Sequence, residues 1–395
     1  MIASNNNQYS TFQILLFLAL CFCASVNLFS ESLNSLALYA VMPGAFVLSF
    51  LRHRSIKTNY YENMLLLLCA WAYISSFWAG YPDAAYRELH QLVGVVLLTY
   101  IFAANTKDLH SVKLWYFVFI VLLINCWVYA RSHIIMSGMA MMGDERMHDR
   151  ILDANTFSYY TAFCTFIVYI YGEMTENLNT KKWLNWAFIL MIPVSFVTAL
   201  LTASRQILIV QIPFCLILIY LRYFFQQSNT RRTWFILAAI LAVVIFAPSA
   251  INTYESSYLY ERSQIDLAED SRTKLMIDAY EVGLKNFPLG VGTGNYAEYS
   301  YNKHFSHNTY LELWANLGIV GLGIFILILY RFIKSQYKRY KATLDKTFLV
   351  FMTFGIIFCL QNIFFSFYTG LWLMGFFILV ASHSETYYKN KHLNI

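Results

Sequence analysis

Residues 287–323 read FPLGVGTGNYAEYSYNKHFSHNTYLELWANLGIVGLG, and the rest of the chain is organised around this stretch. Its first half is polar and rich in glycine and tyrosine, and its second half becomes an apolar helix with no break in sequence. The two halves meet at His307-Asn308. A titratable imidazole at the mouth of a membrane helix meets water on one side and lipid on the other, so we expect chemistry at this junction.

The composition indicates a membrane protein. The chain has 395 residues, of which 58% are hydrophobic and only 13% are charged. A soluble domain carries roughly twice that share of charged residues. Long apolar runs recur from Thr11 to Ala381, so we predict a single integral membrane domain over residues 1–395. The first apolar run follows a segment without Lys or Arg, and we interpret it as a membrane helix and not as a cleaved signal peptide.

Hydropathy predicts an all-α polytopic fold with about twelve transmembrane helices, because each span needs about 20 apolar residues. The expected ranges are 11–29, 33–51, 60–79, 86–104, 113–130, 154–172, 184–201, 204–224, 233–250, 307–330, 346–366 and 369–382.

The distribution of Lys and Arg predicts the orientation of these helices. Most basic residues fall in alternate connectors, and the positive-inside rule places those connectors in the cytoplasm. Both termini are then cytoplasmic, and residues 331–346 form a cytoplasmic loop near anionic lipid. The connector 251–306, between the ninth and tenth helices, becomes a large periplasmic loop. Within it, Asp270-Ser271 can begin a helix that Pro288 stops, and this helix lies on the membrane surface or against the bundle.

Arg205 is the first of three arginines that we single out on the outer side. It sits in the sequence TASRQ at the start of a predicted membrane helix, and no acidic residue lies within ten positions of it. A cation there opposes the positive end of the helix dipole and lies close to hydrocarbon. Arg205 is therefore a candidate anion-binding residue, the alternative being a side chain that reaches to the interface.

Arg272 and Arg150 are the other two candidates. Arg272 opens the predicted loop helix, where Glu269 and Asp270 can neutralise it. Arg150 precedes the sixth helix, with Asp149 and Asp153 as local partners. For both arginines, a local ion pair and a functional role remain open.

The spacing of His304 and His307 raises the possibility of a metal site. Residues three apart share a face of a helix, but zinc prefers three or four ligands and no Asp, Glu or Cys nearby completes a set. The seven cysteines all fall in predicted spans and are interpreted as packing residues. We expect no metal and no cofactor. Beside the polar Asn308 and Glu312, His307 is instead a candidate general base.

The glycines of this region suggest two further roles. Gly290, Gly292 and Gly294 lack the spacing of a dinucleotide fingerprint and follow a helix, so they form either a flexible turn or a backbone nest for a pyrophosphate. Gly318, Gly321 and Gly323 lie within the tenth helix. Small residues let membrane helices approach closely, and we interpret these three as packing residues only.

Four motifs together resemble the bacterial O-antigen ligases and the related Wzy-type polysaccharide polymerases. The spacing of His307-Asn308 and Gly318-Ile319-Val320-Gly321 resembles the membrane signature of the ligases. Thr202-Ala203-Ser204-Arg205 looks like the Thr-x-Ser-Arg element of the family. Arg272 followed by Pro288-Leu289-Gly290-Val291-Gly292 resembles its Arg ahead of Pro-x-Gly-x-Gly, and Asp153-Ala154-Asn155 resembles its Asp-Pro-Asn with Ala154 in place of Pro. The resemblance covers residues 150–323.

This resemblance implies a glycosyltransferase of GT-C-like architecture in the bacterial inner membrane, with its active site facing the periplasm. The donor would be a glycan on undecaprenyl pyrophosphate, and the transfer would be inverting and metal-independent. The acceptor would be lipid A–core for a ligase or another glycan for a polymerase, and we favour the ligase. A transporter of lipid-linked glycan is the rival class, but we find no repeated halves and no ionisable residues at the midplane, which transporters tend to show.

The candidate site follows from the motifs and the chemistry of the leaving group. Guanidinium groups bind phosphates bidentately, so Arg205 and Arg272 are expected to hold the pyrophosphate while His307 takes the proton of the acceptor hydroxyl. The residues that we expect to bind substrate are Arg150, Asn155, Ser204, Gly290, Gly292, Gly294, Asn308 and Glu312.

Overall fold

A computed structural model describes most of the chain. The described residues are 10–26, 31–53, 58–105, 109–136, 154–175, 177–202, 210–225, 228–255, 260, 271–300 and 303–393. The regular structure of these residues is entirely helical.

The first half of the chain supplies the helices α1 (Thr11–Val26), α2 (Glu31–Leu36), η1 (Ala37–Val41), α3 (Met42–His53), α4 (Tyr60–Ser75), η2 (Ser76–Trp78), α5 (Pro82–Asn105), α6 (Leu109–Met136), α7 (Ala154–Met174) and α8 (Leu178–Thr202). The second half supplies α9 (Ile212–Tyr223), α10 (Asn229–Glu255), α12 (Ser271–Lys285), α13 (Tyr296–Tyr299), α14 (Thr309–Thr343), α15 (Lys346–Gln361), α16 (Leu371–Tyr388) and η5 (Lys389–Leu393).

Each of the twelve ranges expected from hydropathy contains a helix. Among the described residues, three helices are long and apolar enough to cross a membrane, namely Pro82–Asn105, Ser111–Val128 and Thr309–Thr343. Shorter apolar helices occur at Thr11–Ser25, Ala37–His53, Ile212–Tyr223 and Lys346–Gln361. The all-helical membrane fold is therefore supported, whereas the count of twelve spans stays a prediction.

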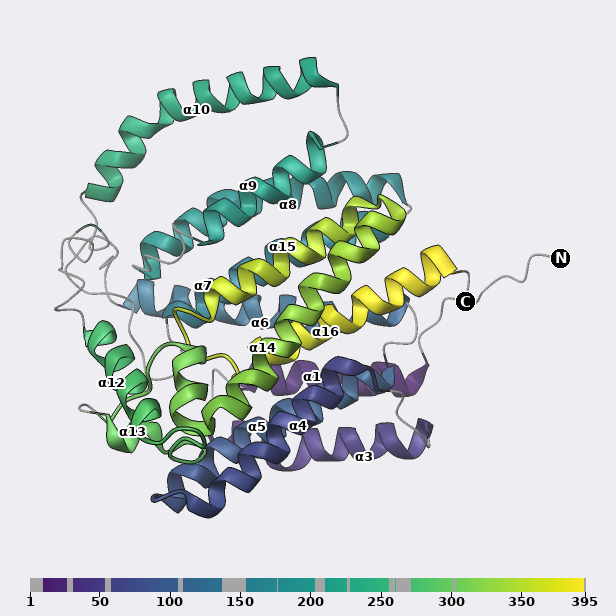
Figure 1. Cartoon of the computed structure of the whole chain (residues 1–395). Helices are drawn as coiled ribbons and strands as arrows, with labels where there is room; N and C mark the ends of the chain where they lie inside the picture. The colour runs from purple at the N-terminus through teal and green to yellow at the C-terminus, as the bar shows by residue number, and fades with distance from the viewer. Residues whose placement is uncertain are drawn as a thin grey trace.

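Helix α14 runs through the middle of the bundle (Figure 1). It packs against α4, α12 and α15, while α5 packs against α3, α4 and α16. Rings of α6, α7 and α16 meet in the core, where the centroid of Phe376 lies 4.6 Å from that of Phe119 and 4.5 Å from that of Phe163. The seven cysteines are free thiols on helices, each buried or half-buried, in agreement with the packing role.

The polar segment after the tenth predicted span is helical, which corrects the expected loop over residues 331–346. Helix α14 continues to Thr343, so the part that follows its kink at Gly318 covers roughly 37 Å at about 1.5 Å per residue, more than the roughly 30 Å hydrocarbon core of a bilayer. Hydropathy cannot separate a polar loop from a polar helix extension. Arg339 fixes this extension to α16 through an ion pair with Glu385 at 2.6 Å.

The predicted loop helix is α12, and it lies against the bundle. Leu275, Ala279 and Gly283 form its buried face. Gly283 faces the Trp314 ring of α14 so closely that a Cβ would lie 2.2 Å from it, and the Trp314 indole N–H donates to the Tyr280 carbonyl at 3.2 Å. Of the two expected positions, the structure supports packing on the bundle.

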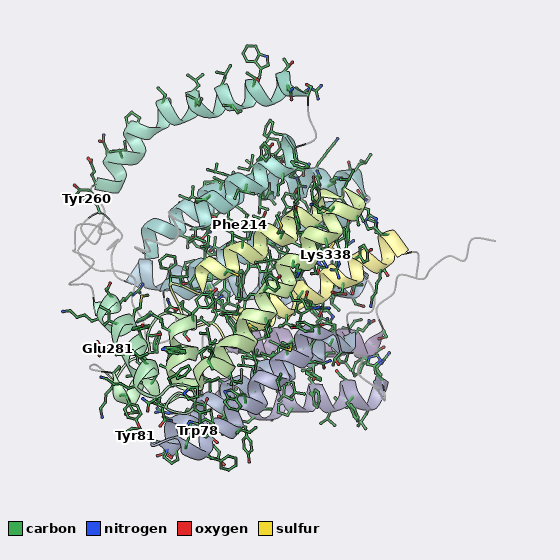
Figure 2. The ribbon with its side chains drawn as sticks, viewed as in Figure 1. Trp78, Tyr81, Phe214, Tyr260, Glu281 and Lys338 are labelled. Carbon is green, nitrogen blue, oxygen red and sulfur yellow. The ribbon has the colours of Figure 1, made fainter. Side chains whose placement is uncertain are left out.

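Figure 2 shows Glu281, Trp78 and Tyr81 at the end of the bundle that carries α12 and α13, and Lys338 toward the other end.

If the predicted orientation is correct, a cysteine at Glu281 reacts with a membrane-impermeant maleimide in intact spheroplasts. A cysteine at Lys338 reacts only after permeabilisation. The unmodified protein is the control, because its own thiols are covered. Labelling of both positions from one side would contradict the predicted topology.

Candidate active site

Helix α14 has a kink at Gly318 that determines the local architecture. Gly318 has φ 64° and ψ −160°, which breaks the helical hydrogen-bond ladder. The Ile319 N–H donates to the Pro288 carbonyl at 3.0 Å instead of to a carbonyl of the preceding turn. The carbonyls of Ala315 and Asn316 lie in the same turn and therefore need partners outside the helix.

The Pro-x-Gly-x-Gly segment supplies those partners. The Val291 N–H donates to the Ala315 carbonyl and the Gly292 N–H donates to the Asn316 carbonyl, each at 2.9 Å. The indole N–H of Trp71 donates to the Leu317 carbonyl at 2.9 Å. Segment 288–292 and the kink therefore satisfy each other's backbone groups.

These contacts require glycine at two positions. A Cβ on Gly318 would lie 2.0 Å from the Pro288 carbonyl oxygen, and a Cβ on Gly290 would lie 2.6 Å from the Ala315 carbonyl oxygen. Both residues also have positive φ, which side chains disfavour. Gly318 is thus more than the packing residue that the sequence suggested.

Most backbone N–H groups of the glycine run are hydrogen-bonded within the protein, and its pyrophosphate-binding role stays a prediction. The N–H of Gly290 donates to the Asn286 carbonyl at 2.9 Å, and the N–H of Thr293 donates to Ser75 Oγ at 3.0 Å. A Cβ on Gly294 would lie 3.0 Å from the Cβ of Glu88, so Gly294 lies against Glu88. With Val291 and Gly292 held by the kink, the N–H groups from Gly290 to Thr293 all have acceptors in the protein.

The junction at His307-Asn308 forms the start of α14. Asn308 is the N-cap, and its Oδ1 accepts from the N–H groups of Tyr310 at 3.0 Å and Leu311 at 3.1 Å. Glu312 Oε2 accepts from the Ser306 N–H at 2.6 Å, so a carboxylate reaches back across the first turn. The amide oxygen of Asn308 is therefore occupied by capping, while Glu312 has one oxygen engaged.

His307 occupies a constrained position immediately before this cap. Its φ of 56° lies in the left-handed region, which is uncommon for residues other than glycine. The half-buried imidazole lies with its centroid 4.2 Å from the Phe305 ring and 5.3 Å from the His304 ring. The backbone turn and the neighbouring rings restrict where the imidazole can point, as a positioned base requires.

The α15–α16 connection anchors the first residue of the helix. The Thr309 N–H donates to the Asn362 carbonyl at 2.9 Å. Thr309 Oγ1 donates to the Phe365 carbonyl at 2.8 Å and accepts from the Phe367 N–H at 2.9 Å. The turn that carries His307 is therefore fixed from both sides.

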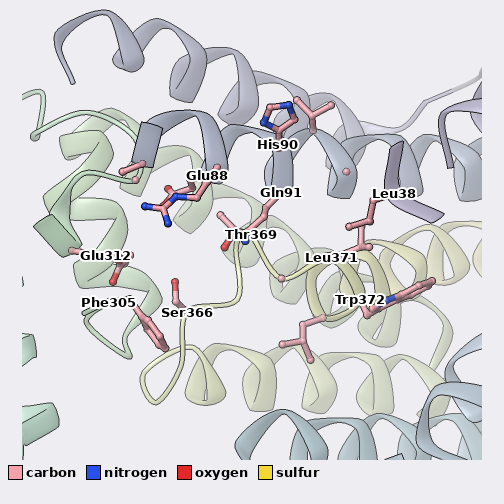
Figure 3. A pocket seen from close by; sticks show the side chains of 18 of the residues that line it. Leu38, Glu88, His90, Gln91, Phe305, Glu312, Ser366, Thr369, Leu371 and Trp372 are labelled. Atoms are coloured by element: carbon pink, nitrogen blue, oxygen red, sulfur yellow. The ribbon is translucent and has the colours of Figure 1, made fainter. Parts of the chain in front are cut away.

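A cavity of about 940 Å³ opens beside this turn (Figure 3). Glu88, Phe305, Glu312 and Ser366 surround one part of it, and Leu38, Leu371 and Trp372 lie at the other. Gly294 and Arg87 also line it. The cavity is thus polar where it meets the start of α14 and apolar where it meets η1 and α16.

Neutral donors hold Glu88 in this cavity. The Tyr368 hydroxyl donates to Glu88 Oε1 in a short hydrogen bond, and Thr293 Oγ1 donates to the same oxygen at 3.3 Å. The Tyr368 hydroxyl itself accepts from Asn316 Nδ2 at 3.3 Å, and Asn316 Oδ1 accepts from the Tyr296 N–H at 2.7 Å. A hydrogen-bonded path therefore links the α14 kink to the cavity carboxylate.

The structure brings some predicted residues together and leaves others undescribed. Gly294 and Glu312 line the cavity. His307 and Asn308 do not line it themselves, but His307 contacts the lining residue Phe305, and Asn308 begins the helical turn that carries Glu312. Arg272 lies in the first turn of α12, whose buried face packs on α14. The expectations for Arg150, Ser204, Arg205 and the side chain of Asn155 fall outside the described residues.

Sequence reasoning missed Glu88, Tyr368 and the cavity role of Arg87. Glu88 and Arg87 looked like a local charge pair near a helix start, and Tyr368 was one aromatic residue among many. Among the described residues, no cation lies within ion-pair distance of Glu88. An acidic residue at the start of a predicted span was the only available signal.

Comparison with known protein families indicates which class of protein combines a helical membrane bundle with such a polar site. Residues 186–326 match the family model described as O-antigen ligase, a segment that begins in α8 and ends in α14. The match confirms the resemblance to the O-antigen ligase superfamily that the motifs predicted. It supports a ligase- or polymerase-type membrane glycosyltransferase. No curated protein matches the chain.

We predict that Gly318→Ala strongly destabilises the protein, by about 2 kcal/mol or more, because the new Cβ clashes with backbone and disfavours the kink. Thermal unfolding in detergent measures the effect. Gly323→Ala is the matched control, since a Cβ there meets nothing within 4 Å. An equal melting temperature for the two variants would show that the kink is not needed.

Proposed function

We propose that the protein transfers a glycan from undecaprenyl pyrophosphate to a sugar hydroxyl of lipid A–core at the periplasmic face of the inner membrane. The observation that carries this proposal is the fixed His307 turn beside a half-polar, half-apolar cavity, within the segment that matches the O-antigen ligase family. An amphipathic substrate suits such a cavity, since lipid and sugar need opposite surroundings. A Wzy-type polymerase has the same donor chemistry and is separated from the ligase by its acceptor.

The proposed reaction is an in-line displacement at the anomeric carbon. The acceptor oxygen forms a bond to this carbon while the bond from the carbon to the pyrophosphate oxygen breaks. The bonding electrons leave with undecaprenyl pyrophosphate, and the proton of the acceptor hydroxyl passes to the imidazole of His307. The configuration at the anomeric carbon inverts, and the donor supplies its own activation.

Two arginines are assigned to the leaving group. Arg272, on the helix that packs against α14, and Arg205, at the predicted start of a membrane helix, would hold the pyrophosphate and stabilise its departing charge. The assignment of Arg205 rests on the sequence motif alone. Because the N–H groups from Gly290 to Thr293 donate within the protein, we assign the anion-binding role chiefly to the arginines.

We expect His307→Ala to lower the transfer rate by about 10²–10⁴-fold, because the acceptor loses its base. Purified protein receives undecaprenyl-pyrophosphate glycan with and without lipid A–core, and the products are separated by size and by lipid. His304→Ala is the matched control and retains most of the activity. Longer chains on the polyprenyl carrier, with lipid A–core ignored, would identify a polymerase. Equal loss in both variants, reversed by a divalent metal, would indicate a metal site.

Arg205→Lys is expected to reduce transfer by about 10²-fold, because Lys keeps the charge but lacks the planar fork that binds phosphate bidentately. The same assay measures the rate at saturating acceptor. Lys285→Arg, an exposed position paired with Glu281, controls for the exchange of one cation for another. Near-normal transfer by Arg205→Lys at normal expression would refute the proposed clamp.

A further inference from the structure

The polar half of the cavity contains carboxylates that the proposed reaction does not use. Glu312 is 4% exposed, yet it lines the cavity. Its Oε2 accepts from the Ser306 N–H, and no other described residue donates to its Oε1. Glu88 is half-buried and held by Tyr368 and Thr293, which are neutral donors. Two carboxylates therefore face the cavity without an ion-pair partner among the described residues.

The lining offers an anionic ligand little compensation. Arg87 and His90 are the basic residues of the described lining, while Glu88, Glu298 and Glu312 are acidic. Glu298 is partly balanced by Lys303 at 3.8 Å. A pyrophosphate placed beside Glu88 and Glu312 would meet carboxyl groups, which do not neutralise an anion in either protonation state. We therefore assign the leaving group to the arginines and not to this wall.

The same lining suits a ring that bears hydroxyl groups. A carboxyl group forms hydrogen bonds with hydroxyls whether it is charged or protonated. Phe305 and Phe365 line the same part of the cavity, with centroids 6.0 Å apart, and offer apolar faces to the C–H side of a sugar ring. Phe305 also contacts the ring of His307, so a sugar at this wall lies next to the proposed base.

We propose that the polar half of the cavity binds an uncharged sugar ring of the glycan substrate. Glu88 and Glu312 accept hydrogen bonds from its hydroxyls, and Phe305 and Phe365 contact its C–H face. Tyr368 is a positioning residue, since its hydroxyl orients Glu88. The ring belongs either to the acceptor or to the donor glycan. This assignment rests on the proposed function for the identity of the glycan, but binding itself needs no transfer.

Binding is tested on the full-length protein in nanodiscs by saturation-transfer NMR. The probes are the methyl glycosides of glucose, galactose and mannose together with the matching uronic acids, which differ by one carboxylate. At least one neutral glycoside is expected to bind the wild-type protein, and its uronic acid is expected to bind about tenfold more weakly. Equal or tighter binding of the uronic acid, or no binding of any neutral glycoside, would overturn the proposal.

Variants locate the site. Glu312→Gln and Glu88→Gln are expected to weaken the neutral glycoside about tenfold and to reduce the discrimination against the uronic acid. Tyr368→Phe keeps the charge and is expected to have a smaller effect. Glu281→Gln, an exposed acid on α12, is the matched control and leaves binding unchanged. Unchanged binding in both cavity variants would refute the site. If neither variant folds, the proposed sugar site is still tested by comparing the binding of neutral glycosides and uronic acids to the wild-type protein.

Competition separates the possible sources of the sugar. Undecaprenyl pyrophosphate without glycan should not displace the neutral glycoside, and displacement by it would overturn the proposal. Displacement only by the glycan-bearing lipid assigns the ring to the donor, and displacement only by lipid-free acceptor glycan assigns it to the acceptor.

In the transfer assay, Glu312→Gln then raises KM for that substrate alone, with kcat changed less. A wild-type protein that binds glycosides but transfers nothing would refute the proposed function and leave this site intact.

Discussion

The backbone hydrogen bonds between segment 288–292 and the kink of α14 are the constraint on which the site depends. An interrupted helix inside an apolar bundle exposes carbonyl and N–H groups that lipid cannot satisfy, so the interruption persists only where other backbone groups are supplied. Val291, Gly292 and Pro288 supply them. The pairing also fixes the glycine run, so that Thr293 and Gly294 lie against Glu88. Helix α12, which precedes the run, packs on α14. A few backbone hydrogen bonds thus join segments that are distant in sequence.

The turn before α14 shows a second consequence of the same need for hydrogen bonds. The N-terminus of α14 begins within the bundle, and its free N–H groups are satisfied by Asn308 and by the α15–α16 connection. Glu312 and Ser306 close the turn from the other side. His307 is left in the left-handed region between these fixed points. Strain at such a residue is tolerated because the surrounding bonds over-determine it, as is common at functional sites.

The proposed function assigns acidic and basic side chains to different parts of the substrate. Glu88 and Glu312 line the cavity, whereas the arginines assigned to the leaving group are Arg272 on α12 and Arg205 at the start of a predicted membrane helix. A glycosyl transfer needs both environments, one for a polyhydroxylated ring and one for a departing anion. His307 lies next to the acidic side through Phe305, where the proton of a hydroxyl would be released. Under the proposed function, the base then lies beside the sugar, and the arginines bind the pyrophosphate.

The sequence by itself determined the all-helical membrane class, the positions of the twelve apolar segments and the importance of the His307 junction. These follow from local properties, namely runs of apolar residues and the placement of rare polar ones. The sequence motifs also indicated the superfamily. Tertiary structure alone decided that Gly318 kinks α14, that the glycine run bonds to this kink, and that α14 extends to Thr343. It alone brought Glu88 of α5 to Tyr368 of the α15–α16 connection. Such pairings join residues hundreds of positions apart, and no local pattern encodes which backbone or hydroxyl group will meet them.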